Sequence, residues 1–265
     1  MSKFSNFIKA FGPGIMFAGT CIGGSHLVQS TKAGAFYGFG LLAVVLAANI
    51  FKYPFFEFAS RYTSATGDSI LEGYRKQGKW ILVIYGVITV FSMFIITAAI
   101  GTFTAGLANN IANQLFGASI LNLKWWAIIL FVIVFAILAY GKFNVLDILL
   151  KIIGLILVVT VFTAFFGVVS NKPFPTAELG VFDIISSKKG LIFGIALMGW
   201  MPIAVDMSTW HSLWTQERIK QTGYHPSLKE TLLDFNIGYI ISLVLAILFL
   251  SIGAYVLYGH PVYTK

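Results

Sequence analysis

Long apolar stretches separated by short polar connectors run along the whole chain. A helix needs roughly 20 residues to cross a hydrocarbon core about 30 Å thick, and these stretches are that long. Each is expected to be a helix, because backbone amides facing lipid have no other partners and strand-like alternation is absent. The pattern predicts an all-α membrane protein, one transmembrane domain over 1–265, with helices at 11–36, 38–60, 80–107, 125–142, 146–170, 189–213 and 231–258.

Flexible and polar residues interrupt the first of these segments near its middle. The run Gly23-Gly24-Ser25-His26 lies at bilayer depth, and each glycine costs a helix about 1 kcal/mol relative to alanine. Polar groups at this depth usually face a cavity or the interior of the bundle. We therefore expect a broken helix whose four residues 23–26 bind a substrate.

A second interruption falls in the sixth segment. Pro202 removes a backbone donor, and the isolated carboxylate of Asp206 follows one turn later, where it needs a partner or water. The pattern Gly-Ile-x-x-x-Gly occurs at 14–19 and again at 194–199, shortly before each interruption. Paired interruptions in corresponding segments indicate the substrate site of an inverted-repeat transporter. The further candidates for substrate binding are Met198, Met201, Pro202 and Asp206.

Other ionisable residues also lie inside the predicted spans. His26 and His211 are candidates for relaying protons, because imidazole titrates near neutral pH. The competing interpretation is a structural histidine bonded to a carbonyl, and it is the stronger one for His211. Lys52 and Glu57 lie in the second segment, where each is expected to reach the cytoplasmic interface or to pair elsewhere.

Composition excludes several classes of function. Of the 265 residues, 58% are hydrophobic and 11% charged, whereas a soluble protein of this size carries far more charge. The net charge of +8 does not predict nucleic-acid binding, because the basic residues form no stripe. The single cysteine, Cys21, excludes an internal disulfide. No cofactor and no catalytic residues are expected, since motifs of nucleophilic or zinc enzymes are absent.

Basic residues in the connectors predict the orientation of the chain. They are more numerous on the side that holds the N-terminus, and such an excess marks the cytoplasmic side. We therefore expect a multi-pass protein of the inner (plasma) membrane with a cytoplasmic N-terminus. The basic residues assigned to that side are Lys3, Lys9, Arg61, Arg75, Lys76, Lys79, Lys142, Arg218, Lys220 and Lys229.

Several short motifs occur in a characteristic order. Gly12-Pro13-Gly14 opens the first segment, Ala33-Gly34-Ala35 begins seven positions after His26, and Met201-Pro202 lies in the sixth segment. Together with the loop 65–75, these motifs resemble the NRAMP family of proton-coupled divalent metal transporters. The resemblance implies a LeuT-type fold, with five helices repeated in inverted orientation, and metal–proton symport.

The departures from the family bear on the substrate. Gly23 and His26 stand where the family has its metal-binding Asp and Asn, although Met201 matches the family's Met ligand. The hard oxygen ligands of the first interruption are therefore missing in this divergent member. His26, Met201 and Asp206 could still hold a metal ion as softer ligands. Alternatively, residues 23–25 could bind a small organic or anionic solute through exposed amides.

A LeuT-type fold has ten core helices, and this sequence supplies seven. We therefore expect the fold to be truncated after the seventh helix, because the chain is a fragment, a truncated reading frame or one part of a larger assembly in which another chain could supply the C-terminal helices. The expected partners are the lipid bilayer and a small ion or solute. The alternatives to transport by this chain are an inactive fragment and a receptor-like membrane protein.

Overall fold

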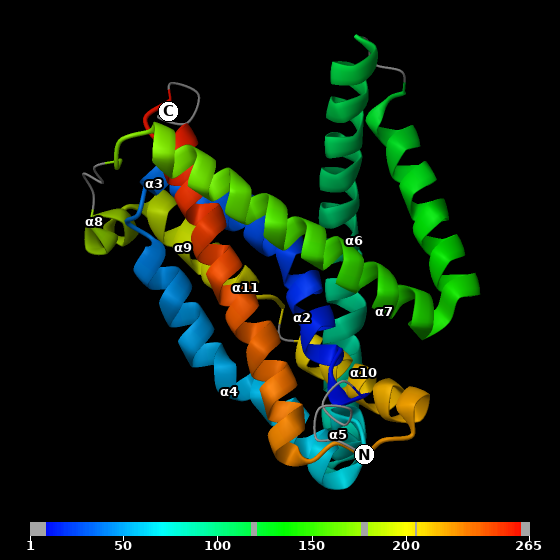
Figure 1. Cartoon of the computed structure of the whole chain (residues 1–265). Coiled ribbons are helices and arrows are strands. Elements are labelled where there is room, and N and C mark those ends of the chain that lie inside the picture. The colour runs from blue at the N-terminus through cyan, green and yellow to red at the C-terminus, as the bar shows by residue number, and fades with distance from the viewer. Residues whose placement is uncertain (1–8, 118–120, 176–179, 205, 261–265) are drawn as a thin grey trace. The chain divides into compact units, whose positions relative to one another are not determined.

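The computed structural model describes residues 9–117, 121–175, 180–204 and 206–260 (Figure 1). These residues form helices and connectors, and no strand occurs among them, which confirms the all-α prediction. The chain divides into two compact units, one comprising 1–73 and 150–265 and the other 74–149. Packing of these two units into a single domain stays a prediction.

The helices follow the order of the apolar segments, and the first and sixth segments are each divided. The second unit contains the end of α5 (Ile70–Gln77), α6 (Lys79–Phe116) and the first part of α7 (Leu123–Asn171), and the first unit contains the rest. Among the described residues, five helical stretches are long and apolar enough to cross a membrane: Leu42–Thr66, Lys79–Phe116, Leu123–Gly141, Phe143–Asn171 and Leu228–Leu257. The helices are α2 (Pro13–Cys21), η1 (Ile22–Ser30), α3 (Thr31–Tyr37), α4 (Leu42–Thr66), α5 (Ile70–Gln77), α6 (Lys79–Phe116), α7 (Leu123–Asn171), α8 (Val181–Ser186), α9 (Lys188–Trp200), α10 (Met207–Thr222) and α11 (Leu228–Leu257).

The first divided helix packs along α11, the last helix of the chain (Figure 1). Glycines permit the contact at two levels. A Cβ atom on Gly14 or on Gly238 would overlap backbone atoms of the opposite helix, and the same holds for Gly34 and Gly253. Small residues allow such backbone contact between membrane helices, where dispersion replaces the hydrophobic effect as the source of association.

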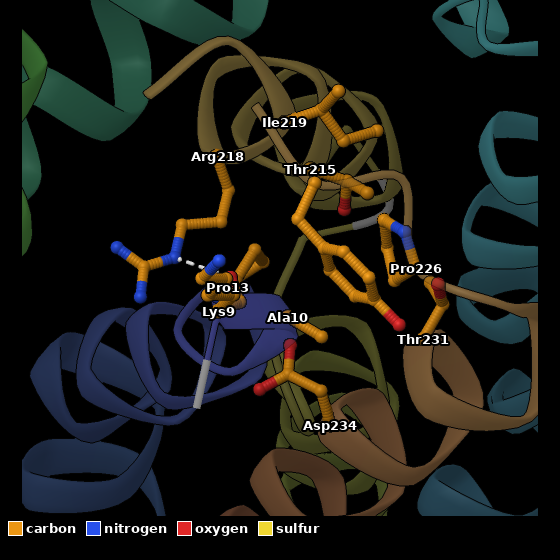
Figure 2. A pocket seen from close by; sticks show the side chains of 10 residues that line it. Lys9, Ala10, Pro13, Thr215, Arg218, Ile219, Pro226, Thr231 and Asp234 are labelled. Atoms are coloured by element: carbon orange, nitrogen blue, oxygen red, sulfur yellow. Dashed lines mark hydrogen bonds between the residues drawn. The ribbon is translucent and has the colours of Figure 1, made fainter. Parts of the chain in front are cut away.

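A buried carboxylate reinforces this contact at the start of α2. Asp234 of α11 accepts hydrogen bonds from the backbone N–H groups of Gly12, at 3.0 Å, and Gly14, at 2.7 Å. These donors have no partner inside the helix, and a negative charge at a helix N-terminus is stabilising. Figure 2 shows this corner, where Arg218 also donates to the Lys9 carbonyl at 3.0 Å. Asp234 therefore fixes both the position and the direction of α2.

Aromatic rings fill the space between α2, α4 and α11. Phe17 lies between Phe56 and Phe235, with ring centroids 5.3 and 5.8 Å away, and stacks on Tyr239 at 5.9 Å. Phe17, Phe56 and Phe235 are almost completely buried. The core of the first unit is thus built around the first divided helix, which makes the position of its interruption dependent on α4 and α11.

Replacing Gly238 with alanine tests the close contact with α2. Because the added methyl group would overlap the Gly14 backbone, we expect a loss of at least about 2 kcal/mol of stability. Thermal unfolding in detergent measures the effect. The matched control is Gly167→Ala in α7, where an added Cβ meets nothing within 4 Å. Equal unfolding midpoints for the two variants would show that the contact contributes little.

Candidate functional site

The first interruption lies at Gly23, as the sequence predicts for residues 23–26. Gly23 has non-helical torsion angles, φ −66° and ψ −124°, and the following turns through Ser30 are π-helical. Gly23 is exposed, and nothing lies within 4 Å of the place where its Cβ would be. π-Helical turns often occur at functional sites. The interruption therefore presents open backbone to its surroundings.

The second interruption separates α9 from α10. Helix α9 ends at Trp200, Met201 is extended at φ −89° and ψ 137°, and α10 begins at Met207. The Met201–Pro202 peptide bond is cis. The carbonyls of the last turn of α9 consequently have no donors from a continuing helix. Pro202 is therefore at the interruption, where the sequence places it.

The two interruptions contact each other within the first unit. A Cβ atom on Gly24 would lie 3.2 Å from Cζ3 of Trp200, so the missing side chain makes room for this ring. The Ser30 hydroxyl donates to the Met201 sulfur at 3.7 Å. Two segments distant in sequence thus lie side by side close to their interruptions. This is the arrangement that forms the substrate site in transporters with inverted repeats.

His26 is fully buried, and both of its ring nitrogens have partners. Nδ1 lies 2.8 Å from the Ser25 hydroxyl, and Nε2 lies 2.8 Å from the carbonyl oxygen and 3.1 Å from the hydroxyl of Ser242. The Ser25 hydroxyl donates in turn to the Cys21 carbonyl. A metal ligand needs a free lone pair on the imidazole. In this conformation His26 instead connects the first interruption to α11.

The other candidate ligands occupy different surroundings. Met201 is fully buried in an apolar cluster with Leu197 and Leu250, whereas Met198 is 39% exposed. Asp206 is half-buried at the start of α10. No hydrogen bond joins His26, Met201 and Asp206 in the described part of the chain, and its histidines, cysteines and carboxylates form no metal-binding group of three.

Lys52 of α4 reaches the second interruption. Its ammonium lies 2.6 Å from the carbonyl oxygen of Met198 and 2.9 Å from that of Gly199, in the last turn of α9. Sequence reasoning placed Lys52 at the cytoplasmic interface or with some other partner and missed this role. The available signal was an ionisable residue inside an apolar span. Nothing in the sequence indicated its partners, which lie 146 and 147 residues away.

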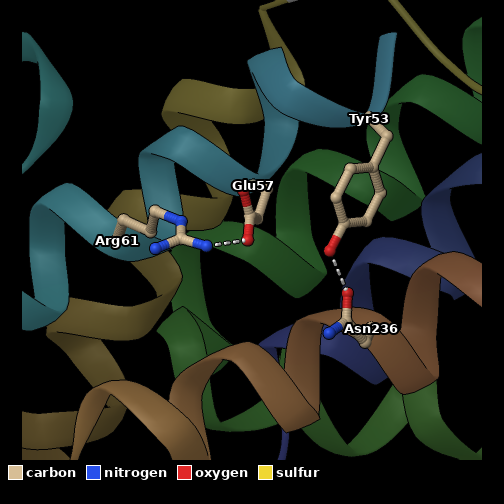
Figure 3. Close-up of polar contacts among 4 residues, drawn as sticks. All are labelled: Tyr53, Glu57, Arg61 and Asn236. Carbon is tan, nitrogen blue, oxygen red and sulfur yellow. Dashed lines mark hydrogen bonds and ion pairs between the residues drawn. The ribbon is translucent and has the colours of Figure 1, made fainter. Parts of the chain in front are cut away.

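The neighbouring acid in the same helix has its own partner. Glu57 accepts from Arg61 at 2.7 Å, one turn along α4 (Figure 3). Tyr53 donates to Asn236 of α11 at 2.7 Å in the same view. Glu57 is therefore paired within α4, and the charge of Lys52 is not matched by it.

His211 makes its side-chain hydrogen-bond contact with α4 rather than with either interruption. Its Nδ1 is 3.2 Å from the Ser60 hydroxyl, and its buried Nε2 has no hydrogen-bond partner in the described residues. Its ring packs edge-on against Phe17 and Phe235, with centroids at 6.0 and 5.5 Å. No hydrogen bond connects His211 with His26 within the described ranges. A proton relay through these histidines stays a prediction.

Sequence comparison assigns the chain to a family. Residues 14–264 match the family described as natural resistance-associated macrophage protein-like, or Nramp. The chain belongs to the Nramp family. The resemblance seen in the short motifs is thereby confirmed, and the family's members are membrane metal-ion transporters rather than enzymes. With its five candidate spans, this Nramp protein is a multi-pass membrane protein.

One curated relative matches the chain over almost its whole length. The uncharacterized protein PM0681 of Pasteurella multocida (strain Pm70) is 35% identical to this Nramp chain over 274 residues. The match covers 97% of this chain and 58% of the relative. The chain thus spans somewhat more than half the length of that relative.

Substituting His26 tests its role as a buried connector. His26→Ala removes both hydrogen bonds and leaves a cavity, so we expect the protein to lose about 2–4 kcal/mol of stability. Thermal unfolding in detergent is the measurement, with exposed His225→Ala as the control. Unchanged stability of His26→Ala would contradict a connecting role and would leave His26 available as a ligand.

Proposed function

We propose that this Nramp chain carries the cargo site of a secondary transporter, at the place where its two interrupted helices meet. The contact of Gly24 with Trp200, together with that of Ser30 with Met201, is the observation that supports it. Free backbone groups at paired interruptions bind cargo near the middle of the membrane in transporters. Rocking of helices around such a site would expose it alternately to the two sides.

Family membership favours a divalent metal ion as the cargo, moved in symport with protons. The ligands on offer are the thioether of Met201, the carboxylate of Asp206 and the imidazole of His26. Thioether and imidazole are softer than the oxygen ligands preferred by manganous or magnesium ions. Binding would require His26 to release Ser25 or Ser242 and Met201 to release Ser30, because these partners occupy the ligand atoms here.

A small non-metal solute is the second candidate cargo. Two observations favour it: the ring nitrogens of His26 are engaged, and an ammonium group lies on the carbonyls of Met198 and Gly199. The open backbone at Gly23 would then contact the solute. This alternative keeps the same scaffold and site and changes the chemistry of the cargo.

The wider architecture of the transporter is also a proposal. We propose a LeuT-type fold, because the two interruptions fall in corresponding segments. We place the protein in the inner membrane with a cytoplasmic N-terminus on the distribution of its basic residues. These proposals determine how the protein is prepared, because uptake is measured on the complete assembly.

Metal uptake by the complete protein in liposomes tests the first cargo. We expect Mn²⁺ or Cd²⁺ uptake to fall at least about tenfold in Met201→Ala and in Asp206→Asn, because each loses a ligand. The controls are Met93→Ala, exposed in α6, and Glu217→Gln, paired with Lys220 on the surface of α10. Saturable uptake of a non-metal solute, with no metal flux in any protein, would select the second cargo.

Proton coupling is tested separately with the two histidines. If His26 takes up the coupled proton, His26→Gln retains uptake but loses its dependence on external pH, since the amide does not titrate. Uptake is measured over a series of external pH values, with His211→Gln compared in parallel. Unchanged pH dependence in His26→Gln would remove His26 from the proton pathway.

A further inference from the structure

The ammonium group of Lys52 lies at the interruption between α9 and α10. Its two hydrogen bonds, at 2.6 and 2.9 Å, go to the carbonyl oxygens of Met198 and Gly199. No carboxylate lies within ion-pair distance of it among the described residues, and Glu57 is bonded to Arg61. A positive charge inside a span is costly unless something compensates it. Here the compensation comes from backbone dipoles.

The end of α9 is an electrostatically suitable place for a cation. The last carbonyls of a helix have no internal donors, and their dipoles sum to roughly half a negative charge. Carbonyl oxygens are also ligands that hard cations accept. Met201, the thioether candidate, follows within one turn and donates its own N–H to the Leu197 carbonyl at 3.0 Å. The carbonyls of Met198 and Gly199 thus closely precede the thioether candidate in the chain.

Lys52 is not oriented as lysines are when they only reach for the membrane surface. A snorkelling side chain carries its charge to the interfacial water, whereas this one, half-buried, bonds to the last carbonyls of α9, which belong to the candidate site. The side chain comes from α4, so it crosses from one helix to another to make the contact. Both features point to a role at the interruption.

We propose that Lys52 determines the charge of the cargo. Its ammonium is a built-in cation that takes the cation position at the end of α9 and keeps divalent metal ions away from the Met198 and Gly199 carbonyls. This inference rests on the proposed site at the two interruptions. It shifts the choice between the two candidate cargoes toward the non-metal solute, because a metal ion at the last carbonyls of α9 would meet the positive charge of Lys52.

Three substitutions of Lys52 separate charge from hydrogen bonding. Lys52→Met removes both, Lys52→Gln removes the charge but keeps a donor for α9, and Lys52→Arg keeps both. Lys32→Met is the matched control, because it removes the charge of an exposed lysine in α3. Binding of Mn²⁺ and Cd²⁺ to the complete protein in nanodiscs is measured by isothermal titration calorimetry, after thermal unfolding has shown that each variant is folded.

We expect Lys52→Met and Lys52→Gln to bind Cd²⁺ at least about tenfold more tightly than the unaltered protein, because the unit charge that occupies the last carbonyls of α9 is removed. Lys52→Arg and Lys32→Met should bind as the unaltered protein does. Adding Met201→Ala to Lys52→Gln should abolish the gain, which locates the ion beside the thioether.

Metal affinity that is unchanged or weaker in both neutral variants would overturn the inference. A gain that survives Met201→Ala would also overturn it, because the ion would then bind elsewhere. Failure of the proposed function is recognised independently, since it appears as absence of saturable uptake of either cargo in liposomes. Metal affinity gained without uptake would thus support the role of Lys52 and count against transport.

Discussion

Backbone contact between the first divided helix and α11 is the constraint on which the site depends. Apolar side chains give little driving force for association in lipid, so the helices are held by close approach and by hydrogen bonds. Glycines at two levels permit the approach, and Asp234 anchors the start of α2 to α11. This contact places Ser242 beside His26, and it therefore sets the position of the first interruption.

Some of the polar groups at the two interruptions are satisfied from within the chain. The Ser25 hydroxyl bonds to the Cys21 carbonyl, and Lys52 bonds to two carbonyls at the end of α9. Unpaired polar groups are expensive at bilayer depth, so these bonds stabilise helices that the interruptions would otherwise weaken. The same bonds leave fewer polar atoms free at the interruptions.

Local features of the sequence indicated the helical class and the family, although the segments expected at 125–142 and 146–170 form one helix, α7. The length of each apolar run indicated a helix, and Gly23-Gly24 and Pro202 indicated where two helices are interrupted, because glycine and proline act on the backbone at their own positions. The motifs from Gly12 to Met201 indicated the Nramp family, which the family match confirms. The roles of His26, Met201 and Asp206 as ligands stay predictions.

Contacts between distant residues were decided by the tertiary structure. Lys52 was visible as a charge inside an apolar span, but its partners on α9 have no local signal. His26 looked like a ligand beside an interruption, and packing against α11 gave both of its nitrogens partners. The sequence alone determined that this protein is helical, membrane-embedded and interrupted at two places, because those properties depend on neighbouring residues. Only the tertiary structure decided which polar atoms remain free, because that depends on which helices approach one another.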